Sequence, residues 1–423
     1  MLKALPIPCL PGGWLMLALA VSPAMAQTGD GSDVGARSLA QVFAAAWQRQ
    51  PEAKSLELRR EVAEAQQQTA DSWTAAQPSL ELSSKTDQLN DDEGSREYVA
   101  GLAIPLWLPG ERSRSSALAQ AESRAVNSRF NAAQLRTAAA VREAWWTWQR
   151  ARGERGLARE QLANAQQIAG DVRRRVRAGD LARADQHQAE AALAGAEARL
   201  AEAEIALLAS ARQLRALAGL TPDESAVDTP EAVPDPARDT TITAAAHPGL
   251  AELLDRAEIA RRSADLAGVQ TWSNPELLLA TTRERGPFEN SWERTMTFGV
   301  RVPFGLQSRN RARSSLARAE ALEAEEQLRL ESERLLAEID TADAQLDAAR
   351  SRLAAADRRA RLAGETRGFF AKSFRLGETD LPTRLRIELE AVEAERQASR
   401  ARIDLAAAIS TLRQVLGLLP EQQ

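Results

Sequence analysis

The chain has 423 residues, of which 44% are hydrophobic and 27% charged, and its net charge is −5. This mild acidity argues against nucleic acid as a partner, because a nucleic-acid-binding protein presents a basic face. No stretch after residue 26 approaches about 18 consecutive apolar residues, so the sequence predicts no transmembrane helix there.

The first 26 residues have the pattern of a secretory signal peptide. An apolar run over residues 14–21 is followed by the small-residue motif "AMA", which is typical of a cleavage site. We expect the mature chain to begin at Gln27, and Cys9, the only cysteine, to leave with the signal. An exported chain of this kind is periplasmic, secreted or part of the outer membrane.

The rest of the chain is predicted to be a tandem duplication. Pro105 recurs as Pro303 and Gly179 as Gly377, each 198 positions further on, and other markers keep the same order and spacing. Several such pairs in one register are not expected by chance among Ala-rich helices, so two copies of one unit are indicated. The predicted parts are a first repeat at 27–222, a linker at 223–240 and a second repeat at 241–423.

Each repeat contains a long proline-free stretch rich in good helix formers. These stretches and the segments after them predict helical hairpins at 111–218 and 308–416. The longer helix of each hairpin would measure about 100 Å, more than a compact core needs. Shorter helices at 52–75 and 250–271 would lie end to end with the return helices, and Ala at the contact stripes would let the rods pack closely.

Residues 79–106 and 276–304 alternate apolar and polar side chains with period two. In the second copy Met296, Phe298 and Val300 share one face, and runs of about ten such residues match tilted membrane β-strands. An ordinary soluble hairpin with one wet face is the alternative. Aromatic residues end the apolar faces and are interpreted as a membrane girdle: Tyr98, Trp107, Trp292 and Phe304.

Four strands cannot close a barrel, and open sheet edges are not tolerated in lipid. The barrel wall is therefore expected to be built from several chains, and three copies would supply twelve strands. The predicted fold class is mainly α with a small β part: long antiparallel helical hairpins plus four β-strands that contribute to a trimeric outer-membrane β-barrel.

These features together resemble the TolC family of outer-membrane efflux channels, from about residue 38 to 419. The tip "VRAGDLARAD" and the closing segments "LRALAGL" and "LRQVLGL" carry the resemblance, and "IPLWLPGERSR" with "VPFGLQSRNR" is more similar to the heavy-metal (CzcC-like) branch. The resemblance implies a homotrimer whose outer-membrane barrel continues as an α-helical tunnel across the periplasm. The resemblance also implies that the tunnel docks onto a periplasmic adaptor and an inner-membrane pump of the RND type.

The two hairpin tips hold the residues to which the resemblance assigns a role. Glycine at each turn would supply a positive φ at a helix end. The expected adaptor contacts are Arg177, Gly179, Leu181, Arg375, Gly377 and Leu381. The expected tunnel aperture consists of Asp185, Thr383, Arg384 and Arg386, with Thr383 standing where the family places Asp. Pairs of Asp185 with Arg384 or Arg386 between neighbouring rods would hold the tunnel shut. For the adaptor contacts, a merely solvated tip is the alternative.

The sequence predicts neither a metal site nor a cofactor. The only histidines, His187 and His247, do not lie in a ligand-spaced cluster. No nucleophile, base and orienting group occur together, so the chain is interpreted as a non-enzyme. The predicted function is a passive exit duct for heavy-metal cations or small toxic compounds. A periplasmic coiled-coil adaptor or scaffold without a pore is the alternative.

Overall fold

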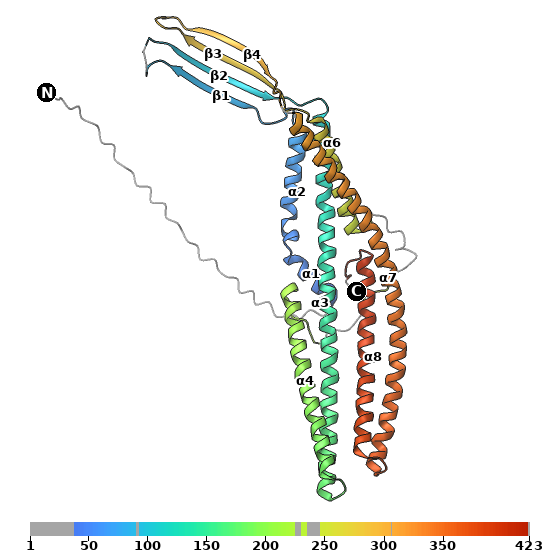
Figure 1. The fold of residues 1–423 in the computed structure, drawn as a ribbon. Helices are drawn as coiled ribbons and strands as arrows, with labels where there is room; N and C mark the ends of the chain where they lie inside the picture. The colour runs from blue at the N-terminus through green and yellow to red at the C-terminus, as the bar shows by residue number, and fades with distance from the viewer. Residues whose placement is uncertain (1–37, 90–92, 225–229, 235–245, 306, 422–423) are drawn as a thin grey trace, which may run out of the picture.

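A computed structural model describes residues 38–89, 93–224, 230–234, 246–305 and 307–421. The expected signal peptide, its cleavage site and Cys9 lie outside these residues. The described part is an elongated bundle of helices that carries a four-stranded sheet at one end (Figure 1). Among the described residues, no helix combines the length and the apolar character that a membrane crossing needs.

Apart from α1, the same order of elements occurs twice among the described residues, as the duplication predicts. The first repeat contains α1 (Leu39–Arg49), α2 (Pro51–Ala70), β1 (Ser79–Thr86), β2 (Arg96–Pro105), α3 (Glu111–Ala178) and α4 (Arg183–Ala218). The second repeat contains α6 (Pro248–Val269), β3 (Glu276–Arg285), β4 (Glu293–Arg301), α7 (Gln307–Leu376) and α8 (Leu381–Val415).

Proline and glycine set the ends of the helices. Pro51 and Pro248 begin α2 and α6, where a missing backbone N–H costs nothing. The 68 residues of α3 lie between Gly110 and Gly179, whose φ angles are 75° and 88°. At 1.5 Å per residue this helix is about 100 Å long, which confirms the predicted rod.

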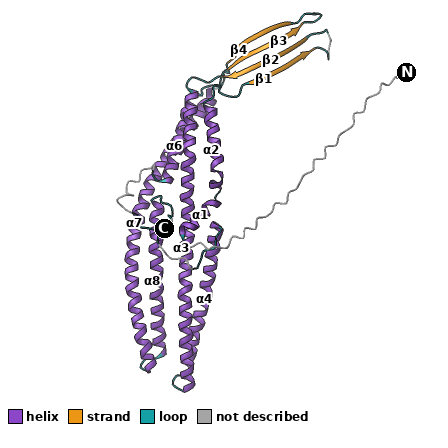
Figure 2. Ribbon diagram, turned by 180° about the vertical axis from the view of Figure 1, so that it is seen from behind, coloured by secondary structure: helices purple, strands orange, loops and turns teal. Residues whose placement is uncertain are grey.

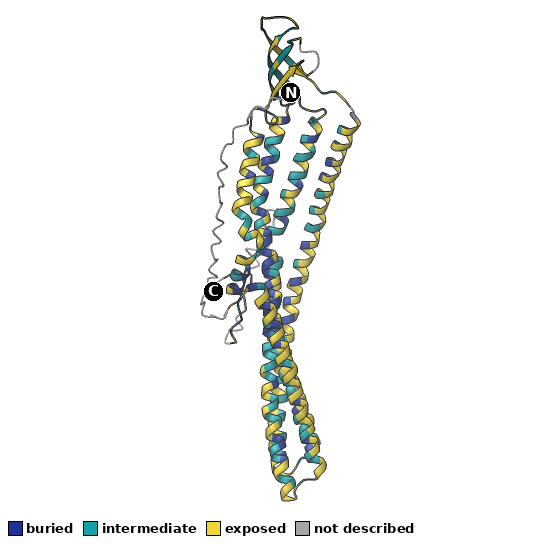
Figure 3. Ribbon diagram, turned by 90° about the vertical axis from the view of Figure 1, so that its left-hand side faces the viewer, coloured by how far each residue is buried: buried dark blue, intermediate teal, exposed yellow. Residues whose placement is uncertain are grey.

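The helices pack as two layers of long rods (Figure 2). In one layer α2 and α4 follow one another along α3; in the other α8 lies along α7, and α6 contacts both α3 and α7. The buried contact positions are largely alanine, for example Ala125 and Ala138 in α3 and Ala391 and Ala394 in α8. Figure 3 shows these buried residues as stripes along the rods, with most of the outward surface exposed.

The central cluster lies where α1 crosses the middle of the bundle. It contains Val42, Trp145, Trp148 and Leu214, none of them more than 2% exposed. Ser38 begins α1, because its hydroxyl accepts a hydrogen bond from the backbone N–H of Gln41. Where α1 lies, the space between the rods is filled by large side chains and not by alanine.

A buried ion cluster anchors the segment between the repeats. The Arg142 guanidinium of α3 donates two hydrogen bonds to Glu231, at 3.0 and 2.7 Å. Arg413 of α8 lies 3.3 Å from the same carboxylate, and the side chains of Arg142, Glu231 and Arg413 are 5%, 10% and 5% exposed. Glu231 lies inside the predicted linker 223–240, so this part of the linker is held by one arginine from each repeat.

The sheet joins the two repeats. Its strands are antiparallel in the order β1-β2-β3-β4, so the pairing of β2 with β3 connects the hairpin of one repeat to that of the other. In the register, Leu102 stands opposite Leu80 on one side and Leu279 on the other. The register therefore decides which side chains share a face across all four strands.

Candidate functional sites: an amphipathic sheet and two hairpin tips

The sheet has one apolar and one polar face. One row across the strands consists of Leu80, Leu102, Leu279 and Phe298. The next row on the same face consists of Leu82, Ala100, Thr281 and Met296. The row between them, on the opposite face, consists of Glu81, Gly101, Ala280 and Thr297. Leu82, Met296 and Phe298 are 72%, 70% and 70% exposed, so no described residue covers this apolar face. An exposed apolar patch of this kind marks a surface that meets a membrane or a partner.

Aromatic residues stand at both ends of the sheet, where the sequence places the girdle. At the loop end the rings of Tyr98 and Trp292 stack with their centroids 5.7 Å apart. At the helix end Phe304 is 95% exposed, whereas the half-buried Trp107 donates a hydrogen bond from its indole to the carbonyl of Ser72 at 3.1 Å. Trp107 thus also fastens the junction between sheet and helices.

The two glycine turns form the free end of the bundle. Gly179 and Gly377 have φ angles of 88° and 80°, which L side chains rarely adopt, and both turns project into open space. Arg177 and Arg375, beside the turns, are exposed, and Leu181 is half-buried. The tips therefore present two arginines on the surface that the sequence assigns to an adaptor.

Leu381 has a different position from the one expected. It is only 1% exposed and packs with Val172 and Phe374 in an apolar cluster between the two tips. Leu381 therefore offers no free surface to an adaptor in this conformation. Leu381 lies at the start of α8 and points towards α3. Sequence spacing within one hairpin does not show this contact with the other hairpin.

Phe374 is held between two arginines. Arg175 donates hydrogen bonds to the carbonyls of Phe374 and Arg375 at 2.9 and 2.8 Å, and its guanidinium carbon lies 4.9 Å from the Phe374 ring centroid. Arg384 approaches the same ring at 5.3 Å and donates to the carbonyl of Ala371. Burial lowers the pKa of Arg384. Sequence reasoning missed Arg175, although the duplication places its turn beside the equivalent turn of the second repeat.

The aspartates near the tips are helix caps. The Asp185 carboxylate accepts a hydrogen bond from the backbone N–H of Ala182 at 3.0 Å. In the second tip the Asp380 carboxylate accepts from the N–H of Thr383 at 3.2 Å. Thr383 stands at the position equivalent to Asp185, and α8 is capped instead from the position before it, by Asp380.

The expected pairs of Asp185 with Arg384 or Arg386 are not formed among the described residues. Arg384 is directed at Phe374 and Ala371, and Arg386 pairs with Glu390 on its own helix at 2.7 Å. If Asp185 pairs with one of these arginines, the two residues must therefore belong to neighbouring copies of the chain.

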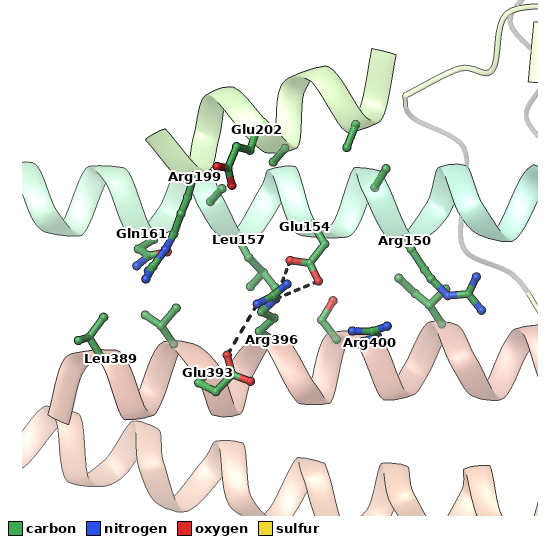
Figure 4. A pocket seen from close by; sticks show the side chains of 17 residues that line it. Arg150, Glu154, Leu157, Gln161, Arg199, Glu202, Leu389, Glu393, Arg396 and Arg400 are labelled. Carbon is green, nitrogen blue, oxygen red and sulfur yellow. Dashed lines mark hydrogen bonds and ion pairs between the residues drawn. The ribbon is translucent and has the colours of Figure 1, made fainter. Parts of the chain in front are cut away.

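A groove lies between α3, α4 and α8 (Figure 4). Arg396 crosses it, with its guanidinium 2.8 Å from Glu154 and 3.9 Å from Glu393. The hydrogen bond that Arg396 donates to Glu154 raises the pKa of Arg396, so its guanidinium stays charged. The groove is a contact between the two hairpins that is held by ion pairs.

The described residues contain no group of three or more His, Cys, Asp or Glu side chains placed to hold a metal ion. His187 is exposed on α4. His247 is 7% exposed and accepts a hydrogen bond through Nδ1 from the backbone N–H of Leu250, which caps α6.

The chain thus combines paired rods about 100 Å long, exposed turns at one end and a sheet with a free apolar face at the other. Residues 42–220 match the family model described as "Outer membrane efflux protein". The match covers the helices and strands of the first repeat, and the second repeat has the same succession of elements from α6 to α8.

Solved structures share this fold over most of the chain. The CusC structure, whose subject is folding and transmembrane channel formation, is 16% identical with a TM-score of 0.76, and covers 91% of this chain and 93% of its own. The CmeC outer membrane channel of Campylobacter jejuni is 16% identical with a TM-score of 0.73, over 90% and 85%. The outer membrane protein VceC of Vibrio cholerae is 16% identical with a TM-score of 0.72, over 90% and 96%. None of the curated proteins matches the sequence.

Proposed function

We propose that three copies of this chain form the outer-membrane channel of a tripartite efflux system, a passive exit duct across the periplasm. The apolar face of the sheet carries this proposal. Phe298 and Met296 are each 70% exposed in the single chain, and such a face is stable when it meets the hydrocarbon of a membrane.

The edges of the sheet call for further copies. Within the described residues β1 and β4 each pair on one side only, and unpaired backbone groups are not tolerated in lipid. Joining β1 of one copy to β4 of the next would close a twelve-stranded barrel with three copies, and the row containing Glu81 and Thr297 would then face the pore. In this arrangement α3 and α7 form the wall of a tunnel that points into the periplasm.

The tips are proposed to meet a periplasmic adaptor through Arg177, Leu181 and Arg375 around the two glycine turns. The adaptor would link the channel to an inner-membrane pump, which we propose to be of the RND type. Exposed arginines at the free end of two rods are suited to acidic or polar groups on such a partner.

The tunnel aperture is proposed to lie at Asp185, Thr383, Arg384 and Arg386. Arg386 is 61% exposed and can exchange Glu390 for Asp185 of a neighbouring copy. One exposed pair is worth only about 0–1 kcal/mol, so the closed state would need several around the ring. Asp185→Asn and Arg386→Gln trimers should conduct more in planar bilayers than the wild type, whereas unchanged opening of both would rule the pair out.

The cargo is proposed to be heavy-metal cations or small toxic compounds. A duct needs no ligands of its own, so selectivity would lie in the pump. The competing function, an adaptor or scaffold without a pore, leaves the exposed apolar face without an environment.

The channel is tested with the full-length chain expressed in a Gram-negative host. We expect a membrane-fraction trimer that dissociates on heating in gels and gives stable conductance steps in planar bilayers. A monomer that remains soluble without detergent and forms no pore would overturn the channel and favour the scaffold.

A further inference from the structure

The loop end of the apolar sheet face carries a group of arginines, the outer arginine cluster: Arg96, Arg283, Arg285 and Arg294. We propose that this cluster binds the phosphate groups of an acylated lipid in the outer leaflet of the membrane. The orientation of the cluster towards that leaflet rests on the proposed channel function.

The strand register brings the arginines together. Arg283 stands directly opposite Arg294, and Arg96 directly opposite Arg285, one row closer to the loops. Like charges opposite one another weaken a sheet. An anion bound between them removes this repulsion, so the arrangement favours a ligand with negative charge.

Carboxylates alternate with these arginines and therefore lie on the other face. Glu97, Glu284 and Glu293 form one row of the polar face, between the two arginine rows in sequence. Among the described residues, none of the four arginines forms an ion pair, and Arg285 donates only to the carbonyl of Gly94 at 3.1 Å. The period-two pattern thus places positive charge outside and negative charge inside at the same level of the sheet.

A hollow of about 730 Å³ lies on the same face beside the cluster. Arg283, Arg294, Tyr98 and Trp292 line it together with Leu82, and Glu293 of the adjoining row borders it, so two arginines face one carboxylate at its edge. The guanidinium carbons of Arg283 and Arg285 lie 5.0 and 5.3 Å from the Trp292 ring centroid, so the indole holds both side chains at the surface. Guanidinium groups fixed in this way lose little freedom when they form paired hydrogen bonds with a phosphate.

The surface next to the cluster fits acyl chains. Leu82, Met296 and Phe298 follow directly below the arginine rows and are all at least 70% exposed. An amphiphile would place its chains on these side chains and its phosphates on the arginines. A free anion would use only the upper half of this surface, so the structure favours a phosphorylated lipid over inorganic phosphate.

The test uses purified full-length trimer in detergent and lipid A carrying two phosphates as the probe, with binding followed by native mass spectrometry. We expect wild-type trimer to retain the phosphorylated lipid and to bind the same lipid without phosphates at least about tenfold more weakly. Arg283→Gln/Arg294→Gln should reduce binding of the phosphorylated lipid by a similar factor. Arg311→Gln/Arg313→Gln, which removes two exposed arginines from the start of α7, should leave it unchanged.

The outcomes separate the lipid site from the channel. Wild-type affinity in Arg283→Gln/Arg294→Gln, with intact trimer and conductance, overturns the lipid site and leaves the channel standing. If inorganic phosphate at millimolar concentration displaces the lipid completely, the cluster is an anion site only, and this result also overturns the lipid site. Loss of trimer and conductance in the wild type would instead contradict the proposed function.

Discussion

Arg175 of the first hairpin donates two hydrogen bonds to the second, to the carbonyls of Phe374 and Arg375. The two tips, about 200 residues apart in sequence, are thereby fastened by one guanidinium. The contact is not symmetric, because the second repeat offers this guanidinium only the Phe374 ring and two backbone oxygens.

We expect Arg175→Met to let the two tips separate, because both hydrogen bonds and the contact with the Phe374 ring are lost. Spin labels at Asp180 and Glu378 measure the distance between the tips. The wild-type distance distribution should be narrow and that of Arg175→Met broader and longer. Arg173→Met removes an exposed arginine of the same helix and should keep the narrow distribution; equal distributions in all three proteins would contradict the fastening role.

Glu231→Gln should strongly destabilise the chain. It leaves Arg142 buried without a carboxylate, whereas Arg413 keeps its ion pair with Glu421 at 2.9 Å, and a buried charge without its partner costs about 3–5 kcal/mol. Glu224→Gln removes an exposed partner of Arg155 and should cost at most about 1 kcal/mol. Thermal unfolding followed by circular dichroism compares the two, and similar melting temperatures would show that the ion cluster is not important for stability.

His247 makes the stability depend on pH. Burial lowers the pKa of His247 below its ordinary value near 6.5, and its Nδ1 must stay unprotonated to accept from Leu250. The unfolded chain therefore binds the proton more readily, so the stabilisation is complete above about pH 6.5 and is lost as pH falls through the lower folded-state pKa. The apparent melting temperature should drop between pH 7 and 5.

The variant His247→Asn isolates this effect. Asparagine caps a helix without titrating in this range, so the drop should become smaller. His187→Asn changes an exposed histidine and should reproduce the wild-type curve. An undiminished drop in His247→Asn would assign the pH dependence to other groups.

Glycine-to-alanine substitutions should change the free energy of unfolding in opposite directions at two positions, one in the turn before α4 and one inside α4. Gly179→Ala forces a side chain into φ 88° and should cost about 1–2 kcal/mol, although no atom lies near the added methyl. Gly195→Ala, inside α4 and also free of neighbours, should stabilise by about 0.5–1 kcal/mol. Hydrogen exchange of the tip amides measures the first effect and thermal unfolding the second; a neutral Gly179→Ala would contradict the backbone argument.

Local patterns predict the rods and the sheet because each depends on the immediate sequence. Gly179 and Gly377 end long helix-forming stretches, and the alternation around Phe298 fixes the faces of a strand. The burial of Leu381 has no such local signal, since it arises from contact with Val172 of the other repeat. Glu231 likewise sits in a proline-containing linker whose composition does not indicate a buried ion pair.

The capping exchange could have been foreseen in part. Asp380 lies directly before a helix-forming stretch, where aspartate is a common cap, and this explains why Thr383 is tolerated. The partner of Arg175 could not be predicted from the sequence. The duplication places equivalent turns near one another but does not show which side chain crosses between them.

Trp145, in the central cluster, lies close to the midpoint of α3, with the sheet at one end of the helix and Gly179 at the other. From this pivot the lower arm of the rod measures about 50 Å, so a tilt of about 5° would displace the turn by about 4 Å. The tryptophans around α1 thus hold α3 at the point about which it would tilt. A small loss of packing there would therefore produce a larger displacement of the Gly179 turn.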